Sequence, residues 1–384
     1  MACRALVALV LFFSQTCASW ANETMQAAGL NSPDYNQSVV KVGLMRLPKP
    51  RPQQGQVLIK VMSSSVNHLD LLWEVINPPL MWKAFVASWQ AQGAFPKVLG
   101  LDVAGIVTAV GPDVSRLHVG DQVWAFNAAN CVYDGRTFAG LAGHTWAEYV
   151  AIDADQVSLK PSSMNFQEAG ALPLDALTAL GALKLAGAPW RTGGAVLILG
   201  ATGGVGHFAV QLARALGARK VIATASKLHQ TFVKSLGVDH FIDYHTSNWW
   251  NSSVVPDGSL VAVVDTVLQP LTGDRAFSKL EKYGRFVSLC QSIPVCGAPM
   301  ASTATQLEHL TISQHALRCT SGSCAGASQL DELRHYVDVG KLKIHLEKIV
   351  PLTSIIDAVA ELEGGHTVGK VGITVNNCSE MLLV

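Results

Sequence analysis

Apolar and polar residues change their spacing roughly 155 residues into the chain. Before that point, short apolar or alternating runs are separated by turns that contain glycine or proline, a pattern typical of short β-strands. After it, apolar strands alternate with segments whose apolar residues recur every three or four positions, as on one face of a helix. The two halves therefore predict two different architectures.

The first half predicts a β-structure. Its expected strands are Met25–Leu30, Gln56–Met62, Leu99–Val110, Val119–Phe126 and Thr145–Ile152. The proline-rich stretch Leu47–Pro52 predicts a connector between the first two strands. Because glycine turns separate many short strands, residues 25 to about 155 are expected to form a partly open β-barrel.

The second half predicts alternating helices and strands. The expected strands are Val196–Leu199, Val221–Thr224, Phe241–Ile242, Leu260–Asp265, Arg285–Leu289 and a last one, Lys370–Val375, that returns to the first domain. The expected helices are Phe166–Ala171, Leu174–Ala186, His207–Leu216, Leu228–Leu236, Leu330–Val339 and Ile355–Leu362. This alternation predicts an α/β fold with a doubly wound parallel sheet.

The turn after Val196–Leu199 carries the most informative motif. Gly200, Gly203 and Gly206 form a GxxGxxG pattern between a strand and a helix. Glycines permit a tight turn and let the backbone approach a pyrophosphate, which the first amides of the helix then bind. The turn residues expected to bind a dinucleotide are Gly200, Thr202, Gly203, Gly204, Val205 and Gly206. A glycine-rich turn without a ligand is the alternative.

Composition narrows the class of protein. The chain has 384 residues, 49% of them hydrophobic, which is enough for two domains with sizeable cores. Its 28 basic and 28 acidic residues give a formal net charge of zero, and the basic residues are scattered. Neither a nucleic-acid partner nor binding to an anionic membrane surface is therefore expected.

The first 21 residues predict a cleavable leader. Arg4 precedes the apolar run Ala5–Phe13, and small and polar residues follow as far as Ala21. This is the layout of a secretory signal peptide, and the run is too short to span a bilayer. The expected destination is the endoplasmic reticulum lumen, the exterior, or a plastid reached by the secretory route. A mitochondrial presequence, which usually contains several arginines, is the alternative.

These stretches resemble the medium-chain dehydrogenase/reductase superfamily, and within it the zinc-free quinone oxidoreductase-like branch. The residues that carry the resemblance are Val57–Val61, Val66–Asp70, Val98–Gly111, Val119–Val123, Ala147–Val150, Ala169–Leu180, Val196–Ala225, Phe241–Tyr244, Val264–Val267, Gly284–Leu289 and Gly369–Val375. The resemblance implies a GroES-like catalytic domain at residues 25–157 and a Rossmann NADP-binding domain at residues 158–318. Residues 319–384 would return to the catalytic domain. Trp73–Phe95 is longer than is usual for the family.

The family's zinc positions hold few suitable ligands in this chain. Zinc-dependent members use a cysteine, a GHE motif and a later cysteine or aspartate. Here Asn67 stands at the first position, Leu101 and Asp102 at the second, and Asp175 near the third. Because zinc needs about three converging ligands, no metal is expected. Asp102 is interpreted as a structural carboxylate bonded to local backbone.

The end of the second parallel strand predicts which nicotinamide coenzyme binds. NAD-specific sites place an acidic residue there to bind the ribose 2′-hydroxyl. This chain has Ser226 and Lys227, whose hydroxyl and ammonium suit a phosphate and so favour NADPH. The resemblance adds Tyr244 as a contact to the adenosine phosphate. It also places Thr178, Val287, Ser288 and Leu289 at the nicotinamide. A solvated Lys227 and a structural Thr178 are the alternatives.

Without a metal, a conjugated acceptor is easier to reduce than an isolated carbonyl, because the developing charge spreads to an oxygen that a few hydrogen bonds stabilise. The resemblance thus implies an NADPH-dependent reductase of a quinone or an α,β-unsaturated carbonyl. Asn67 and Asp70 occupy the family's N-x-x-D positions, with Asn67 donating to the substrate oxygen and Asp70 orienting it or a water. As an alternative, both residues cap the following helix. Lys370 matches a lysine found near the coenzyme in some members, or lies on the surface.

Two other functions fit the same fold. One is an enoyl-thioester reductase, which would need a basic patch for a phosphopantetheine carrier. The other is a non-catalytic NADPH-binding interaction protein. Members of the family are commonly dimers, so the resemblance also implies a homodimer.

Overall fold

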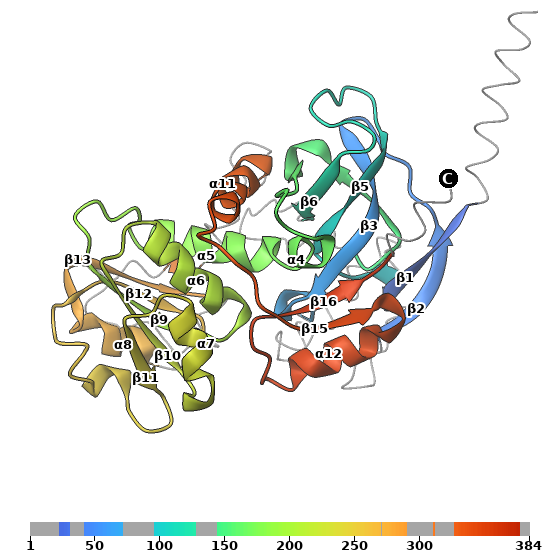
Figure 1. The fold of residues 1–384 in the computed structure, drawn as a ribbon. Coiled ribbons are helices and arrows are strands. Elements are labelled where there is room, and N and C mark those ends of the chain that lie inside the picture. Colours follow the sequence, from blue (N-terminus) through green and yellow to red (C-terminus); the bar gives the residue numbers. More distant parts are fainter. Residues whose placement is uncertain are drawn as a thin grey trace, which may run out of the picture.

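A computed structural model describes residues 23–30, 42–71, 96–127, 144–269, 271–289, 310–311 and 326–376. The predicted leader and the whole Trp73–Phe95 segment lie outside these residues. Figure 1 shows two lobes: the N-terminal strands lie together with the C-terminal elements on one side, and the parallel sheet with its helices lies on the other. The predicted α/β fold, with a doubly wound parallel sheet and a separate β-domain, is confirmed.

The β-domain is built on two sheets. Its strands are β1 (Thr24–Leu30), β2 (Val42–Pro48), β3 (Gln56–Val66), β4 (Lys97–Val98), β5 (Asp102–Val110), β6 (Gln122–Phe126), β7 (Tyr149–Asp153) and β8 (Val157–Leu159). β1 pairs with β2 and β4, whereas β3 pairs with β5 and β7 in the larger sheet. The predicted strand Leu99–Val110 is interrupted at Gly100, whose φ of 89° ends β4 and starts a new direction at β5.

Two strands of this domain differ from the prediction. β3 continues to Val66, four residues beyond its expected end. The extension contains three serines, Ser63, Ser64 and Ser65, which lie fully buried but interrupt the apolar pattern in the sequence. The residues before the expected connector form β2, which pairs antiparallel with all of β1 from Val42 to Pro48. Every residue of β2 after Val42 is partly or fully exposed, and this weakens the apolar signal.

The parallel sheet has the order β11-β10-β9-β12-β13-β14. Its strands are β9 (Ala195–Leu199), β10 (Lys220–Ala225), β11 (His240–Asp243), β12 (Leu260–Asp265), β13 (Leu280–Ser288) and β14 (Leu310–Thr311). Val196 and Ile198 of β9 belong to one buried cluster, and Leu197 and Leu199 to another on the opposite face. Both faces of the sheet are therefore covered, as in a doubly wound fold.

Helices pack on both faces of this sheet. They are α5 (Pro173–Leu185), α6 (Gly204–Ala215), α7 (Gln230–Ser235) and α8 (Thr272–Phe277), whereas the short helix α4 (Phe166–Ala169) packs against β3 and β5 of the β-domain. The single helix expected at Leu228–Leu236 is a 3₁₀ turn at Lys227–His229 followed by α7, because the Ser226 hydroxyl accepts from the Leu228 amide and starts the turn.

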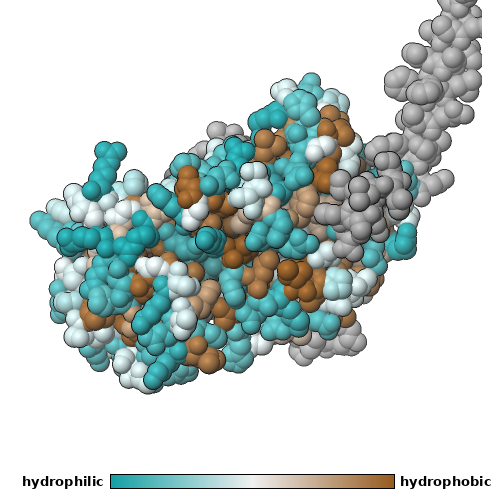
Figure 2. Space-filling view, in the orientation of Figure 1, coloured by the Kyte–Doolittle hydropathy of each residue, from teal (hydrophilic) through white to brown (hydrophobic). Residues whose placement is uncertain are grey.

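The C-terminal segment crosses back to the β-domain. It contains α11 (Ala327–Asp338), β15 (Leu346–Pro351), α12 (Ile355–Glu363) and β16 (Lys370–Thr374). β16 pairs antiparallel with β3 and parallel with β15, a strand that the sequence analysis missed. Figure 2 shows hydrophilic residues dominating the visible surface of the parallel-sheet lobe. Within the described ranges, no helix combines the length and apolar character needed to cross a bilayer.

Candidate active site

The glycine turn forms an open cradle at the carboxyl end of β9. Gly200 has a φ of 83°, and a Cβ at Gly206 would lie 2.0 Å from the Gly200 carbonyl oxygen. Both positions therefore require glycine for the turn itself. Gly203 is different: a Cβ there would meet nothing closer than 3.7 Å, so this residue faces open space.

Helix α6 begins at this cradle without a side-chain cap. Gly203 is its N-cap residue and, among the described residues, no side chain accepts a hydrogen bond from its first turn. The first amides of a helix have no partner within the helix, and the helix dipole favours an anion beside them. A pyrophosphate group fits this combination of open space and free amides.

The residues expected at the adenosine end lie on the same edge of the sheet. Ala225 at the end of β10 is in register with Asp243 at the end of β11, and the Tyr244 amide donates to the Ala225 carbonyl at 3.3 Å. Ser226 and Lys227 follow Ala225 directly. The Gly200 amide donates to Thr224 Oγ1 at 3.1 Å, which joins the glycine turn to the end of β10. The strand order thus brings these predicted contacts to one edge.

The residues expected at the nicotinamide lie at the ends of neighbouring elements. Ser288 ends β13 in register with Asp265 of β12, and the Leu289 amide donates to the Asp265 carbonyl at 3.0 Å. Val287 is buried in the sheet, and Thr178 is half-buried on α5. α5 packs against β13, so these positions belong to the same side of the site.

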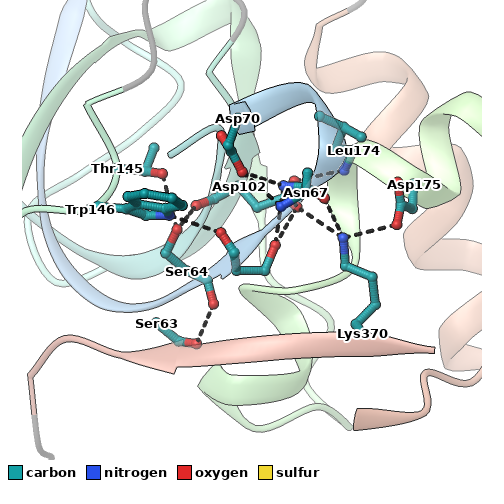
Figure 3. A network of polar contacts seen from close by, with 11 residues as sticks. Ser63, Ser64, Asn67, Asp70, Asp102, Thr145, Trp146, Leu174, Asp175 and Lys370 are labelled. Carbon is teal, nitrogen blue, oxygen red and sulfur yellow. Dashed lines mark hydrogen bonds and ion pairs between the residues drawn. The ribbon is translucent and has the colours of Figure 1, made fainter. Parts of the chain in front are cut away.

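A buried polar cluster lies beside Gly204 of the glycine turn. Figure 3 shows how its side chains contact one another. We define it by six residues: Ser65, Asn67, Asp70, Asp102, Asp175 and Lys370. β3 and the 3₁₀ turn η1 (His68–Leu71) that follows it, β5, α5 and β16 each contribute, so residues up to 303 positions apart meet here. Lys370 is 2% exposed, and its predicted alternative as a surface lysine is wrong.

Asp102 supplies the cap that α5 lacks. Its Oδ1 accepts from the Leu174 amide at 2.7 Å, in the first turn of α5, where the N-cap residue Leu172 offers no side-chain acceptor. Its Oδ2 accepts from Ser65 Oγ at 2.7 Å. The expectation that Asp102 bonds local backbone is therefore wrong, because its backbone partner lies 72 residues away. Asp102 ties the β-domain to the helix that leads into the parallel sheet.

Both polar atoms of the Asn67 side chain form hydrogen bonds within the cluster. Its Nδ2 donates to Asp70 Oδ2 and Asp102 Oδ2, both at 3.1 Å, and to Ser65 Oγ at 3.3 Å. Its Oδ1 accepts from Lys370 Nζ. Asp70 Oδ2 also accepts from the Asn67 backbone amide at 2.8 Å, as the third helical residue does in a capping box. This contact is of the kind that the capping alternative expects for Asp70. The side-chain amide of Asn67 is engaged with protein oxygens.

The charges of the cluster do not balance if every group is ionised. Three buried carboxylates, of Asp70, Asp102 and Asp175, surround the Lys370 ammonium, whose Nζ lies 2.9 Å from Asp175 Oδ2 and 3.8 Å from Asp102 Oδ2. Burial, with the nearby Asp102 charge, raises the pKa of Asp70 to about 8, and burial also raises the pKa of Asp102. Burial lowers the pKa of Lys370, but Asp175 and Asp102 raise it above its ordinary value overall. Asp70 therefore carries a proton at neutral pH.

This proton predicts how stability depends on pH. Asp70 keeps its proton in the folded state up to about pH 8, whereas the unfolded chain releases it near 3.8, so the free energy of unfolding should fall as pH rises from 6.5 to 8. Asp70 alone contributes at most about 1.4 kcal/mol per pH unit to this slope. Asp70→Asn should flatten it. The test is urea unfolding of both proteins at several pH values.

Two buried histidines set the lower limit of pH 6.5 for this measurement of stability. Burial lowers the pKa of His207 and of His144 to about 4, so both stay neutral in the fold and change stability only below 6.5, in the opposite direction. Asp102 is retained in the variant, so part of the slope should remain. Equal slopes for the two proteins would contradict a protonated Asp70.

His207 is a feature that the sequence analysis assigned only to a helix. It lies fully buried on α6, where Nδ1 is 3.0 Å from the Gly203 carbonyl oxygen. The signal was present, since His207 stands four residues after Gly203 and next to the apolar Phe208 on a helix with a buried face. Among the described side chains, no three His, Cys, Asp or Glu residues are grouped in a way that could hold a metal ion.

Comparisons with known proteins agree with this geometry. A family described as alcohol dehydrogenase GroES-like domain matches residues 53–162, and one described as zinc-binding dehydrogenase matches residues 236–371. The chain is 31% identical to a 2-methylene-furan-3-one reductase of Solanum lycopersicum, over 84% of this chain and 73% of that protein. It is 32% identical to the mitochondrial NAD(P)H oxidoreductase RTN4IP1 of Mus musculus, over 84% and 82%.

A comparison with solved structures also finds a similar protein. The quinone oxidoreductase from Coxiella burnetii superposes with a TM-score of 0.72 at 28% identity, covering 92% of this chain and all of that one. The similarity therefore extends across both the β-domain and the parallel-sheet domain.

Proposed function

From its membership of the medium-chain dehydrogenase/reductase superfamily, in the quinone oxidoreductase-like branch, we propose that this oxidoreductase transfers a hydride from NADPH to a quinone or an α,β-unsaturated carbonyl without zinc. The observation that carries the proposal is the open glycine cradle beside a strand end without an acidic residue. The names of two relatives, a 2-methylene-furan-3-one reductase and a quinone oxidoreductase, support the acceptor class.

The choice of NADPH rests on the end of β10. Ser226 and Lys227 stand where an NAD-specific site would place a carboxylate, and Tyr244 lies on the next strand end, 54% exposed. A hydroxyl, an ammonium and a phenol can all bind a 2′-phosphate. We assign these three residues to that phosphate, and Thr178 with Val287–Leu289 to the nicotinamide end.

The chain's own residues would then bind, orient and supply a proton. NADPH supplies the hydride when bound. Reduction of a conjugated acceptor leaves an enolate that needs a proton, and Asp70 holds one at neutral pH. Asp70 Oδ1 has no hydrogen-bond partner among the described residues, so its proton is not committed elsewhere. Asn67 acts as a positioning residue, because its amide is engaged with the carboxylates.

Steady-state kinetics with both coenzymes tests the proposal. With a quinone or an enone as acceptor, kcat/KM for NADPH should exceed that for NADH at least about tenfold. Lys227→Ala should remove most of this preference by weakening NADPH use alone. Lys234→Ala, at an exposed position of α7, is the matched control and should change neither value.

Several outcomes would change the assignment. A tenfold preference for NADH would reject the coenzyme assignment. Reduction of enoyl thioesters alone would favour the enoyl-thioester reductase. Tight NADPH binding without reduction of any acceptor would favour the non-catalytic interaction protein.

The destination of the protein belongs to the same proposal. A mitochondrial relative covers most of this chain, and the names of others place them in mitochondria or chloroplasts, which supports the mitochondrial alternative for the leader. None of these names indicates a secretory route. We therefore propose an organelle destination.

A further inference from the structure

Asp175 stands where two helices begin. It is the third residue of α5, and its Oδ2 lies so close to Gly204, the first residue of α6, that a Cβ on Gly204 would be 2.0 Å from it. Asp175 therefore leaves no room for a side chain at Gly204. A carboxylate oxygen thus lies against the helix start that forms the cradle.

This carboxylate creates an electrostatic conflict. The start of α6 attracts anions through its free amides and its dipole. A negative charge fixed beside it would compete with the phosphates of a dinucleotide, and inside a protein such repulsion is weakly screened. Asp175 is 8% exposed, so water reduces the repulsion only slightly.

Lys370 removes the conflict. Its Nζ lies 2.9 Å from Asp175 Oδ2, and a Cβ on Gly204 would be 3.4 Å from Lys370 Cδ, so the lysine passes beside the start of α6. The preceding Gly369 amide donates to the Thr202 carbonyl at 2.8 Å, which fixes the start of β16 against the glycine turn. The same Nζ donates to Asn67 Oδ1. One side chain therefore contacts both Asp175 and the side-chain amide of Asn67 in the buried polar cluster (Figure 3).

We propose that Lys370 neutralises Asp175 at the start of α6, and that this charge balance sets the affinity of the glycine turn for the dinucleotide phosphates. Lys370 is a positioning residue: it acts through Asp175. The inference rests on the proposed function in one respect, that a nicotinamide dinucleotide binds at the glycine turn.

Calorimetric NADPH titration of four proteins tests the charge balance without any turnover. Asp175→Asn removes the carboxylate beside the phosphates and leaves Lys370 with Asp102, whose Oδ2 lies 3.8 Å from Nζ, so NADPH should bind about threefold to tenfold more tightly than it binds to the wild type. Lys370→Met leaves the carboxylate uncompensated, so binding should weaken at least about tenfold. The double variant should return to within about threefold of the wild type, because both charges are gone.

A matched exposed pair provides the control. Lys348 Nζ and Glu361 Oε2 are 3.1 Å apart on β15 and α12, and Lys348→Met should leave NADPH affinity unchanged. Lys370→Arg keeps the charge and should bind NADPH nearly as the wild type does. If Lys370→Met does not fold, Asp175→Asn still decides the question, since it retains the shape of the side chain.

Two results would overturn the inference. Unchanged NADPH affinity in Asp175→Asn would mean that the carboxylate does not act on the phosphates. Lys370→Met could also reduce NADPH affinity by the same factor in the wild type and in the Asp175→Asn variant. That result would mean that Lys370 contacts the phosphates directly. A wild-type protein that binds neither NADPH nor NADH would instead refute the proposed function.

Discussion

Replacing Gly203 with valine is expected to reduce NADPH affinity at least about hundredfold while leaving the thermal stability of the protein nearly unchanged. A side chain at this position meets no protein atom within 3.7 Å at its Cβ, and the backbone of Gly203, with φ of −73°, accepts any residue. The valine therefore fits the fold but fills the cradle in which the pyrophosphate would lie. Calorimetric titration with NADPH and a thermal melt of the same sample measure the two effects.

Gly206→Val makes the necessary comparison. Its Cβ would lie 2.0 Å from the Gly200 carbonyl oxygen, so this variant should lose both coenzyme affinity and stability. The contrast between the two variants separates damage to the turn from occupation of the cradle. If Gly203→Val binds NADPH as tightly as the wild type, the coenzyme does not use this turn and the proposed function fails.

Replacing Asp102 with alanine should cost about 3–5 kcal/mol of unfolding free energy, the range found when one partner of a buried ionic network is removed. The change deletes the acceptor for the Leu174 amide and for Ser65 Oγ, and it removes one of the two carboxylates nearest Lys370. Urea unfolding at constant pH measures the loss.

Two further variants are compared with Asp102→Ala for their loss of unfolding free energy. Asp102→Asn keeps an acceptor for the Leu174 amide and should lose less stability than the alanine variant. Glu361→Ala breaks the half-exposed pair with Lys348 and should cost less than about 1 kcal/mol. A loss for Asp102→Ala as small as that of the surface pair would show that the cluster contributes little to stability.

Much of the fold could be predicted because its signals are local. The apolar run at β9, the glycines after it and the helical spacing of α6 are adjacent in the sequence, and Leu260–Asp265 was predicted with its observed bounds. Edge strands were harder. β15 has one buried residue, Val350, among exposed charged ones, so its composition did not indicate a strand.

The buried polar cluster could be predicted only in part. Asn67 and Asp70 lie three residues apart in the sequence and were found by the resemblance to the family's N-x-x-D positions. Their partners Asp102, Asp175 and Lys370 come from three other elements, and the burial of Lys370 depends on the pairing of β16 with β3. A lysine followed by alternating apolar residues looks the same on a surface strand. The charge balance therefore appears only when the chain is folded.

The late position of Lys370 has a consequence for biosynthesis. Asp175 leaves the ribosome 195 residues before the lysine that neutralises it. Until then the parallel-sheet domain can form its strands, but Asp102 and Asp175 lack the ammonium that they contact in the folded protein. The buried polar cluster can therefore assemble only after β16 has been translated, which makes completion of this strand the committing step of maturation.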